Sequence, residues 1–475
     1  MTAVRIAIVG GGFTGAALAV HLARVSAQPL AIDIFEPRET VGAGLAYGSC
    51  GIEHRINVPS DCMIVFAEDP QHFSRWLRRS GIWAADPQGL TPDGDHYPRR
   101  HAFGAYMADL VKETAAGNAS GSVLRHRRVA VADVREKPRS LEVLSDDGTD
   151  TYDHVVLCAS HGTPAFRWPL SAGAADLPHL IRNPWRQDQL AAVPRRAAVF
   201  ILGTGLTMAD VVVTLRSHGH LGPICAVSRH GLLPMPHAAF DDDFDLFGAA
   251  DRPGTALALL RFMRRRARDA QRQGLTWHVA IDALRRQLAA YWPALPMAER
   301  AKIVRKLRAY WDVHRFRMAP QVARHMEQGR REGWLHILAG RIESIGRDGD
   351  RFAVHWIPRG GGSRISAADT IVNCTGPDSD ISRSELAVVR ALVERACIGP
   401  DPLRIGIDVD AEGRVLDRNG RSHARLRAAG PLARSIVGEA TGVPEASQHA
   451  RIVATALASA IARRNGLHAL PGDAA

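Results

Sequence analysis

The feature that most constrains the fold is a glycine pattern placed directly after the first predicted strand. Val4 to Val9 is an apolar run, and Gly10, Gly12 and Gly15 follow it in a G-x-G-x-x-G arrangement before a helical stretch from Ala16 to Arg24. In such a loop the first glycine makes a tight turn, the second lets a pyrophosphate approach the backbone, and the third lets helix and strand pack closely. The order strand, glycine turn, helix predicts a dinucleotide-binding βαβ unit.

An acidic residue stands where this unit needs one. A second predicted strand, Leu30 to Phe35, ends at Glu36, which follows Gly15 by 21 residues. A carboxylate there accepts the hydroxyls of a ribose, while the helix after the turn, which contains Phe13 and Thr14, directs its free N–H groups at the phosphates. We expect FAD in this first loop.

A second fingerprint begins at Gly203. The strand Ala198 to Leu202, the loop Gly203-Thr204-Gly205-Leu206, the helix Thr207 to His218 and the strand Ile224 to Val227 repeat the same order, with Met208 in the third glycine position. The second strand ends in Ser228-Arg229 instead of an acid. Because an acid would repel a 2′-phosphate and arginine would bind it, this loop favours NADPH over NADH.

The rest of the chain fits an α/β fold of two Rossmann-like domains. We expect an NAD(P) domain at 166–375, with a helical insert at about 240–335, inserted into an FAD domain made of 1–165 and 376–475. Further strands are expected at Val129 to Val134, Leu141 to Leu144 and Asp153 to Ala159, a β-rich stretch at Leu335 to Asn373, and helices at Gln71 to Arg79 and Ser447 to Arg463.

Composition excludes several classes of protein. The net charge of +11 raises the odds of an anionic ligand, and two dinucleotides satisfy that demand without nucleic acid. No apolar run reaches the length of a membrane span, which is about 18 residues. The six cysteines form no C-x-x-C pair and no zinc spacing, so we expect no metal and a cytoplasmic location.

Several stretches resemble a family of FAD/NAD(P)-binding flavoproteins related to class B flavin monooxygenases, especially those that hydroxylate amines. The stretches are Gly10 to Gly15, Gly44 to Tyr47, His54 to Pro59, Pro98-Arg99 with Gly104 and Tyr106, Gly203 to Asp210, Ser228 to Pro234, and Val443 to Glu445. Asp153 to Ser160 and Asp369 to Pro377 are also similar to the D-x-V-V-x-A-T-G crossover of such proteins, with Ser160 where glycine is usual. The Baeyer–Villiger signature is absent.

The resemblance implies roles for residues outside the two loops. It implies that Arg99, Gly430, Pro431, Ser447 and Gln448 contact FAD, with the helix near Ser447 directing its N-terminus at the flavin. It further implies that His54 and Asn57 lie over the flavin ring, Asn57 donating a hydrogen bond. An equally simple interpretation of the residues around Asn57 is a turn that enters an extended segment.

Three functions remain open at this stage. The resemblance favours a monooxygenase that reduces FAD with NADPH, activates O2 and oxygenates a small metabolite, such as an amine or an amino acid. The second function is an NADPH-dependent flavin reductase for a protein or quinone acceptor, and the third is a non-enzymatic nucleotide sensor. The oligomeric state is open, a homo-oligomer included.

Overall fold

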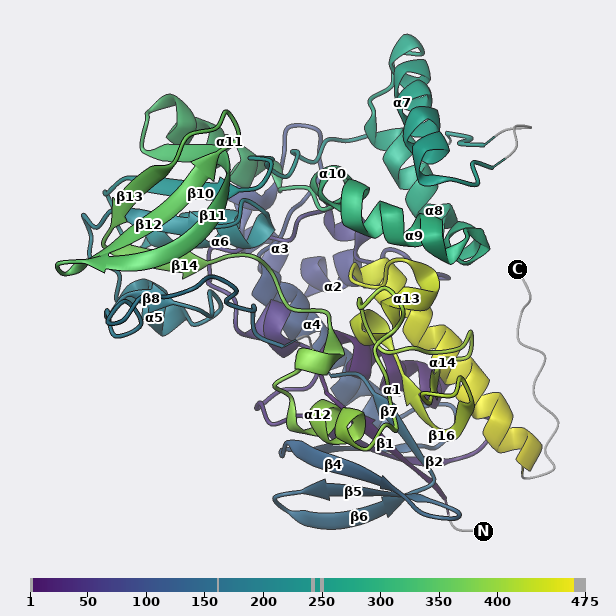
Figure 1. The fold of residues 1–475 in the computed structure, drawn as a ribbon. Helices are drawn as coiled ribbons and strands as arrows, with labels where there is room; N and C mark the ends of the chain where they lie inside the picture. Colours follow the sequence, from purple (N-terminus) through teal and green to yellow (C-terminus); the bar gives the residue numbers. More distant parts are fainter. Residues whose placement is uncertain (1–2, 160–161, 241–243, 248–251, 465–475) are drawn as a thin grey trace.

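The computed structural model describes residues 3–159, 162–240, 244–247 and 252–464. Two large sheets and a helical segment make up most of the molecule (Figure 1). Ser160, which departs from the crossover pattern, lies outside the described residues. The α/β class with parallel sheets and covering helices confirms the fold predicted from the sequence.

The first sheet holds the first glycine loop. Its order is β15-β16-β7-β1-β2-β3, and all neighbours are parallel except β15 and β16. Its strands are β1 (Val4–Val9), β2 (Leu30–Phe35), β3 (Val123–Arg127), β7 (His154–Leu157), β15 (Arg414–Leu416) and β16 (Ser422–Ala428). Ile8 pairs with both Ile34 and Val156, so the loop after β1 and Glu36 after β2 reach the same edge of the sheet.

The second sheet repeats this arrangement around β9. Its order is β13-β12-β11-β10-β9-β14-β8, parallel from β8 to β11 and antiparallel beyond. Its strands are β8 (Leu180–Ile181), β9 (Val199–Leu202), β10 (Ile224–Ser228), β11 (Leu335–Asp348), β12 (Arg351–Pro358), β13 (Arg364–Ala368) and β14 (Thr370–Asn373). The chain thus leaves the first sheet after β7, completes the second with β14, and returns to the first at β15 and β16.

Small side chains let two helices pack closely on the first sheet. Helix α1 (Phe13–Val25) buries Ala16, Ala17 and Ala19, and the last helix, α14 (Val443–Arg464), brings alanines and Val453 into the same core. A three-stranded meander, β4 (Val131–Glu136), β5 (Leu141–Ser145) and β6 (Gly148–Tyr152), lies on the other side with α12 (Ala387–Glu394). The sheet therefore separates two aliphatic cores, one under α1 and α14 and the other under the meander and α12.

The remaining helices cover the sheets or form the insert. They are α2 (His72–Arg79), α3 (Ile82–Ala85), α4 (Arg100–Ala116), α5 (Gln187–Ala191), α6 (Leu206–Ser217), α7 (Ala256–Arg272), α8 (His278–Ala294), α9 (Met297–Lys302), α10 (Arg308–Arg315), α11 (Pro320–Arg331) and α13 (Arg434–Val437). Short turns of helix occur at Gly44–Gly48, Ser60–Cys62, Pro87–Gly89, Ile303–Leu307, Ile381–Arg383 and Gly430–Ala433. No helix among the described residues combines the length and the apolar character that crossing a membrane requires.

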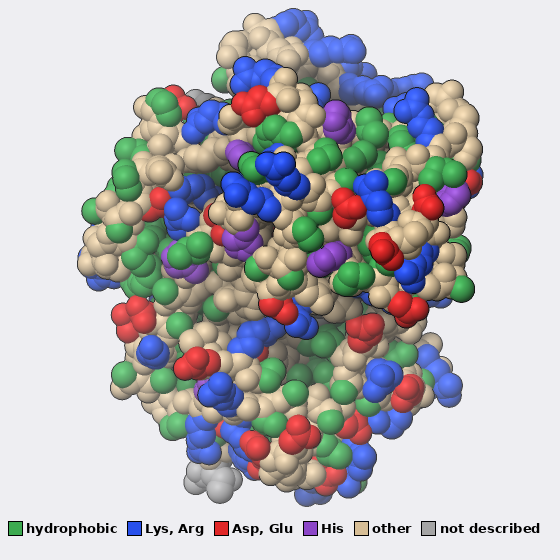
Figure 2. All heavy atoms as spheres, turned by 90° about the vertical axis from the view of Figure 1, so that its left-hand side faces the viewer, with side chains coloured by type: hydrophobic (Ala, Val, Ile, Leu, Met, Phe, Trp, Pro, Cys, Tyr) green, Lys and Arg blue, Asp and Glu red, His purple; other side chains and the backbone are tan. Residues whose placement is uncertain are grey.

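The arginine-rich helix α7 projects from the body of the molecule. It forms the upper end in Figure 1, and basic side chains gather at that end in Figure 2. Below it, the face in Figure 2 is hollowed between the upper part, which carries the second sheet, and the lower part, which carries the first.

Helices α14 and α4 are two of the elements that differ from the sequence-based expectation. Helix α14 begins at Val443, one turn before the predicted start at Ser447, because Pro444 fits the first turn of a helix, where its missing N–H leaves no bond unmade. Helix α4 was not predicted. It contains Gly104, which lowers helix propensity, and a Cβ there would lie 2.8 Å from the carbonyl oxygen of Tyr47.

The position of Met208 gives a stability prediction. Met208 belongs to α6, and its side chain is fully buried in the core under that helix. The first glycine loop has Gly15 at the equivalent position. We expect Met208→Ala to lower the free energy of unfolding by about 2–5 kcal/mol, because the cavity cannot close completely. Urea denaturation followed by circular dichroism measures this loss.

The control is Leu221→Ala, which truncates a side chain that is 53% exposed between α6 and β10. We expect a change within about 0.5 kcal/mol. Equal losses in the two variants would show that Met208 is not part of a tightly packed core.

Candidate functional site

The first loop has the backbone that a dinucleotide cradle requires. Gly10 adopts a φ of +102°, and a Cβ on it would lie 2.7 Å from the carbonyl oxygen of Cys158 at the end of β7. A Cβ on Gly15 would lie 1.9 Å from the carbonyl oxygen of Gly10. Both positions therefore exclude any side chain, as the motif predicts.

Gly12 differs from its neighbours because the space in front of it is open. Its φ is −68°, which any residue adopts, and the only atom within 4 Å of an added Cβ is the Cα of Gly44, at 3.5 Å. Helix α1 begins at the next residue, Phe13, and carries no acid in its first turn. The free N–H groups of that turn and the open face of Gly12 fit a pyrophosphate.

Glu36 lies beside this loop, as predicted. Its side chain is buried, and Oε2 accepts a hydrogen bond from the Gly11 N–H at 3.2 Å. Oε1 accepts from the backbone and the guanidinium of Arg38, at 3.1 and 2.9 Å. The carboxylate is thus held at the loop, in the position of a ribose acceptor.

The second loop reproduces the first around a different strand. Gly203 has a φ of +108°, and its Cβ would lie 2.6 Å from the carbonyl oxygen of Cys374, just beyond β14. Nothing lies within 4 Å of a Cβ on Gly205, and α6 begins at Leu206, followed by the half-buried Thr207. This loop is more open than the first and is built to the same plan.

At the end of β10, Ser228 is hydrogen-bonded to the loop, whereas the side chain of Arg229 is unpaired among the described residues. The hydroxyls of Thr204 and Ser228 are 2.8 Å apart, and the Ser228 hydroxyl also accepts from the Gly231 N–H at 3.0 Å. Arg229 is exposed, and its side chain has no hydrogen-bond or ion-pair partner within the described part of the chain. An unpaired guanidinium at this edge suits a 2′-phosphate.

Asn57 is held by an arginine that the sequence did not single out. The guanidinium of Arg100, at the start of α4, donates to both carboxylate oxygens of Asp210 in α6, at 2.6 and 3.0 Å. It also donates to Oδ1 of Asn57 at 3.3 Å. Since arginine only donates, the Asn57 side chain must present its NH2 group in another direction, available to an acceptor.

His54, predicted to be catalytic, forms hydrogen bonds with both of its ring nitrogens. Its Nδ1 accepts from the Gly51 N–H at 3.2 Å, so its proton lies on Nε2, which is 2.8 Å from the hydroxyl of Thr214 in α6. Thr214 in turn donates to Glu53. Burial lowers the pKa of His54, so the ring is neutral and joins this loop to the second sheet.

The other predicted FAD contacts lie in two groups. Arg99 precedes α4, and its guanidinium donates to the carbonyl oxygen of Ile52. Gly430, with a φ of +73°, lies against the first loop, because its Cβ would lie 2.4 Å from the hydroxyl of Thr14. Gly430 and the half-buried Pro431 therefore adjoin the N-terminus of α1.

His449 was missed at the sequence level. Its Nδ1 accepts from the Gly430 N–H at 3.1 Å, while Nε2 is buried without a partner among the described residues. Burial lowers its pKa to about 4, so Nε2 carries the only ring proton at neutral pH. A lone histidine in a helix gives no signal of this kind, since its partner, Gly430, is brought near only by the fold.

The start of α14 is tied to the helical insert by buried charges. Ser447 lies inside the helix, donating to the Val65 carbonyl oxygen at 2.7 Å, and Gln448 is exposed. Glu445 stands in the first turn and pairs with Arg285 and Arg315. Burial acts to raise the pKa of Glu445, but the two arginines outweigh it and hold that pKa below its usual range.

The buried cysteines next to the two loops are inert thiols. Burial raises the pKa of Cys158 and of Cys374 well above the ordinary value, and no disulfide forms among the described residues. Neither thiol therefore ionises at neutral pH to act as a nucleophile or an electron acceptor.

Residues 7–162 match the model of a FAD-NAD(P)-binding family. No curated protein sequence matches the chain. Three solved structures share its fold over nearly the whole length.

The first is L-lysine 6-monooxygenase from Pseudomonas syringae, at 17% identity and a TM-score of 0.63, covering 97% of this chain and 100% of that one. The second is the ornithine N-hydroxylase of Kutzneria sp. 744, solved with reduced FAD, NADP+ and L-ornithine, at 16% and 0.61, covering 98% and 100%. The third is the FAD-bound cadaverine monooxygenase of Erwinia amylovora, at 12% and 0.62, covering both chains completely. At these identities the likeness shows a shared fold.

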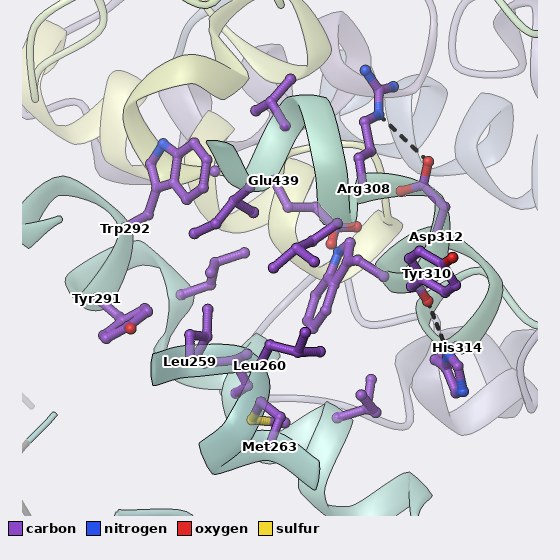
Figure 3. A pocket seen from close by; sticks show the side chains of 18 of the residues that line it. Leu259, Leu260, Met263, Tyr291, Trp292, Arg308, Tyr310, Asp312, His314 and Glu439 are labelled. Carbon is purple, nitrogen blue, oxygen red and sulfur yellow. Dashed lines mark hydrogen bonds and ion pairs between the residues drawn. The ribbon is translucent and has the colours of Figure 1, made fainter. Parts of the chain in front are cut away.

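A cavity of about 610 Å³ is lined by α7, α8, α10 and the segment that precedes α14 (Figure 3). Tyr310 forms part of its wall, and its ring lies 5.5 Å from that of His230, next to Arg229. Gly438 and Thr441, just before α14, form another part. The cavity is therefore lined by the helical insert together with the segment that leads to α14.

A matched pair of glycine variants tests the two loops. We expect Gly12→Val to fold and to lose FAD, because its side chain fills the open face where the pyrophosphate would lie. Gly205→Val should keep FAD and lose affinity for NADPH. Flavin absorbance after desalting and NADPH titration measure both results.

Both backbones are extended at these positions, so valine is accommodated without strain. Equal FAD contents in Gly12→Val and the unaltered protein would contradict the assignment of the first loop. A loss of FAD in Gly205→Val would contradict the assignment of FAD to the first loop and NADPH to the second.

Proposed function

We propose that this protein is an FAD-dependent NADPH oxidoreductase that oxygenates an amine-bearing small molecule. The observation that carries the proposal is the pair of matching loops, at Gly10 and Gly203, each with an open glycine before a helix N-terminus. The shared fold with three amine monooxygenases supports the reaction type. In the balanced reaction, substrate, O2, NADPH and a proton give hydroxylated substrate, water and NADP+.

We assign residues 1–165 and 376–475 to an FAD domain and 166–375 to an NADPH domain. In the first, Gly12 and the N-terminus of α1 would hold the pyrophosphate, and Glu36 a ribose. Gly430, Pro431 and Thr14 would border the same nucleotide, with the unpartnered N–H of His449 nearby. In the second, Gly205, Leu206 and Thr207 would take the phosphates and Arg229 the 2′-phosphate.

The flavin, when bound, supplies the redox chemistry by accepting a hydride from NADPH and reacting with O2. The chain supplies orientation. Arg100 fixes the direction of the Asn57 amide, so that its NH2 group is free to donate to the flavin ring. Asp210 fixes Arg100 in turn, so α6, a helix packed on the second sheet, would set the geometry of Asn57.

The unpaired guanidinium of Arg229 gives a test of cofactor choice. We expect NADPH to reduce the flavin more efficiently than NADH. Arg229→Ala should lower kcat/KM for NADPH about 10- to 100-fold, as for loss of a charge-assisted contact, with little effect on NADH. Anaerobic stopped-flow reduction with each nucleotide measures the ratio.

Arg195→Ala is the control. Arg195 precedes β9 and donates a hydrogen bond to the carbonyl oxygen of Gly219, which precedes β10, so it lies at the opposite edge of the sheet from Arg229. This variant should leave discrimination unchanged. Unaltered discrimination in Arg229→Ala would place the phosphate reader elsewhere, with His230 the next candidate.

The fate of the electrons tests the reaction type. With a suitable amine present, most NADPH should be consumed in forming hydroxylated product and the rest in forming H2O2. Asn57→Ala should raise the ratio of H2O2 to product about fivefold, as expected for losing a hydrogen bond of about 1 kcal/mol. Simultaneous assays of NADPH, H2O2 and hydroxylamine measure it.

Asn419→Ala, at an exposed turn, is the matched control and should not change this ratio. Rapid reduction of a quinone by NADPH, with no oxygenated product from any amine or amino acid, would favour the flavin reductase. Absence of flavin reduction by either nucleotide would leave the nucleotide sensor.

A further inference from the structure

We infer that the cavity under the helical insert binds the organic substrate, and that this substrate has an apolar body and an anionic head group. The inference rests on the proposed function, and it concerns a site in which neither nucleotide loop takes part. Its evidence is the composition of the walls and the distribution of charge along them.

The walls of the cavity are mostly apolar. Leu260 and Met263 of α7 and Trp292 of α8 lie on one side in Figure 3. Ile303, Val304 and Trp311 add further apolar surface from the next segment. A volume of about 610 Å³ falls within the range of ligand sites for small organic molecules, about 300–1,000 Å³.

The polar groups gather on the other side. Arg308, Tyr310, Asp312 and His314 lie together in Figure 3, opposite the leucines and Met263 of α7. Such a division suits a ligand that is apolar at one end and polar at the other. A short, strongly polar diamine would leave the apolar half of the cavity in contact with water.

The balance of charge selects an anion. The two carboxylates of the wall are paired, Asp312 with Arg308 at 3.4 Å and Glu439 with Arg315 at 3.0 Å. Arg434 has no carboxylate partner within the described part of the chain. Its Nε donates to the Ile405 carbonyl oxygen at 2.8 Å and one terminal nitrogen to the Ser379 hydroxyl at 2.6 Å.

Two arginines of the wall lack a carboxylate partner among the described residues: Arg264 of α7, which is exposed, and Arg434, which is half-buried. Burial lowers the pKa of Arg434 to about 10, so it remains protonated at neutral pH, and a carboxylate would relieve the cost of its desolvation. Arg434 begins α13, which lies a few residues before α14 and the predicted flavin contact. An anionic head held there would place the ligand beside that segment.

Binding of simple probes to the FAD-containing protein, without NADPH, tests the inference. Hexanoate, octanoate and decanoate should bind with affinities that rise about fourfold for each added methylene, as burial of hydrocarbon requires. Octylamine should bind at least tenfold more weakly than octanoate. Isothermal calorimetry measures the affinities, and Trp277, Trp292 and Trp311 in the wall should report binding by fluorescence.

Two kinds of variant locate the probe. Arg434→Gln should weaken octanoate about 10- to 100-fold and leave octanol unchanged, while Arg434→Lys should restore part of the affinity. Val304→Trp and, independently, Leu260→Trp should fill the cavity and abolish binding of both. Ile365→Trp, at a site 65% exposed on β13, is the control and should have no effect.

Opposite outcomes overturn the inference. Tighter binding of octylamine than of octanoate would overturn the anionic head group, and unchanged affinity in both tryptophan variants would overturn the site. The proposed function is tested separately by NADPH-dependent oxygenation. If lysine or ornithine is oxygenated at the same rate in Val304→Trp and Leu260→Trp, the function stands and this substrate class is wrong.

Discussion

The contact on which the structure depends is that of a glycine with the end of the neighbouring parallel strand. Gly10 packs on the carbonyl oxygen of Cys158, and Gly203 packs in the same way on that of Cys374. At both places a left-handed backbone and the lack of a side chain let the loop turn sharply from strand to helix. The helix N-terminus is thereby exposed at the edge of the sheet, where a phosphate can approach it.

Charged groups join the elements around the first sheet to the elements around the second sheet and to the helical insert. Arg100 and Asp210 join α4 to α6, and the same arginine orients Asn57. Arg285 and Arg315 bind Glu445 at the start of α14, so the helical insert is joined to the element predicted to face the flavin. These ion pairs are shielded from solvent, and removing one partner would leave a buried charge uncompensated.

The predicted residues fall into those that local sequence can place and those that it cannot. Gly10, Gly12, Gly15, Glu36, Gly203 and Gly205 were found because turn geometry and strand order are written in adjacent residues. The hydrogen bonds of His54 to Gly51 and Thr214 could not be predicted, because Thr214 is 160 residues away. Arg100 and His449 were missed for the same reason, since their partners, Asp210 and Gly430, are close only in the folded chain.

The sequence by itself determined the fold class, the positions of both glycine loops and the order of strand, turn and helix around each of them. These features follow from periodicity and from the conformational freedom of glycine, which act over a few residues. Only the tertiary structure decided that Asn57, Arg100 and Asp210 meet, and which charged side chains of the cavity wall form ion pairs. The cavity wall is built from α7, α8, α10 and α13, so its geometry depends on how the intervening elements pack.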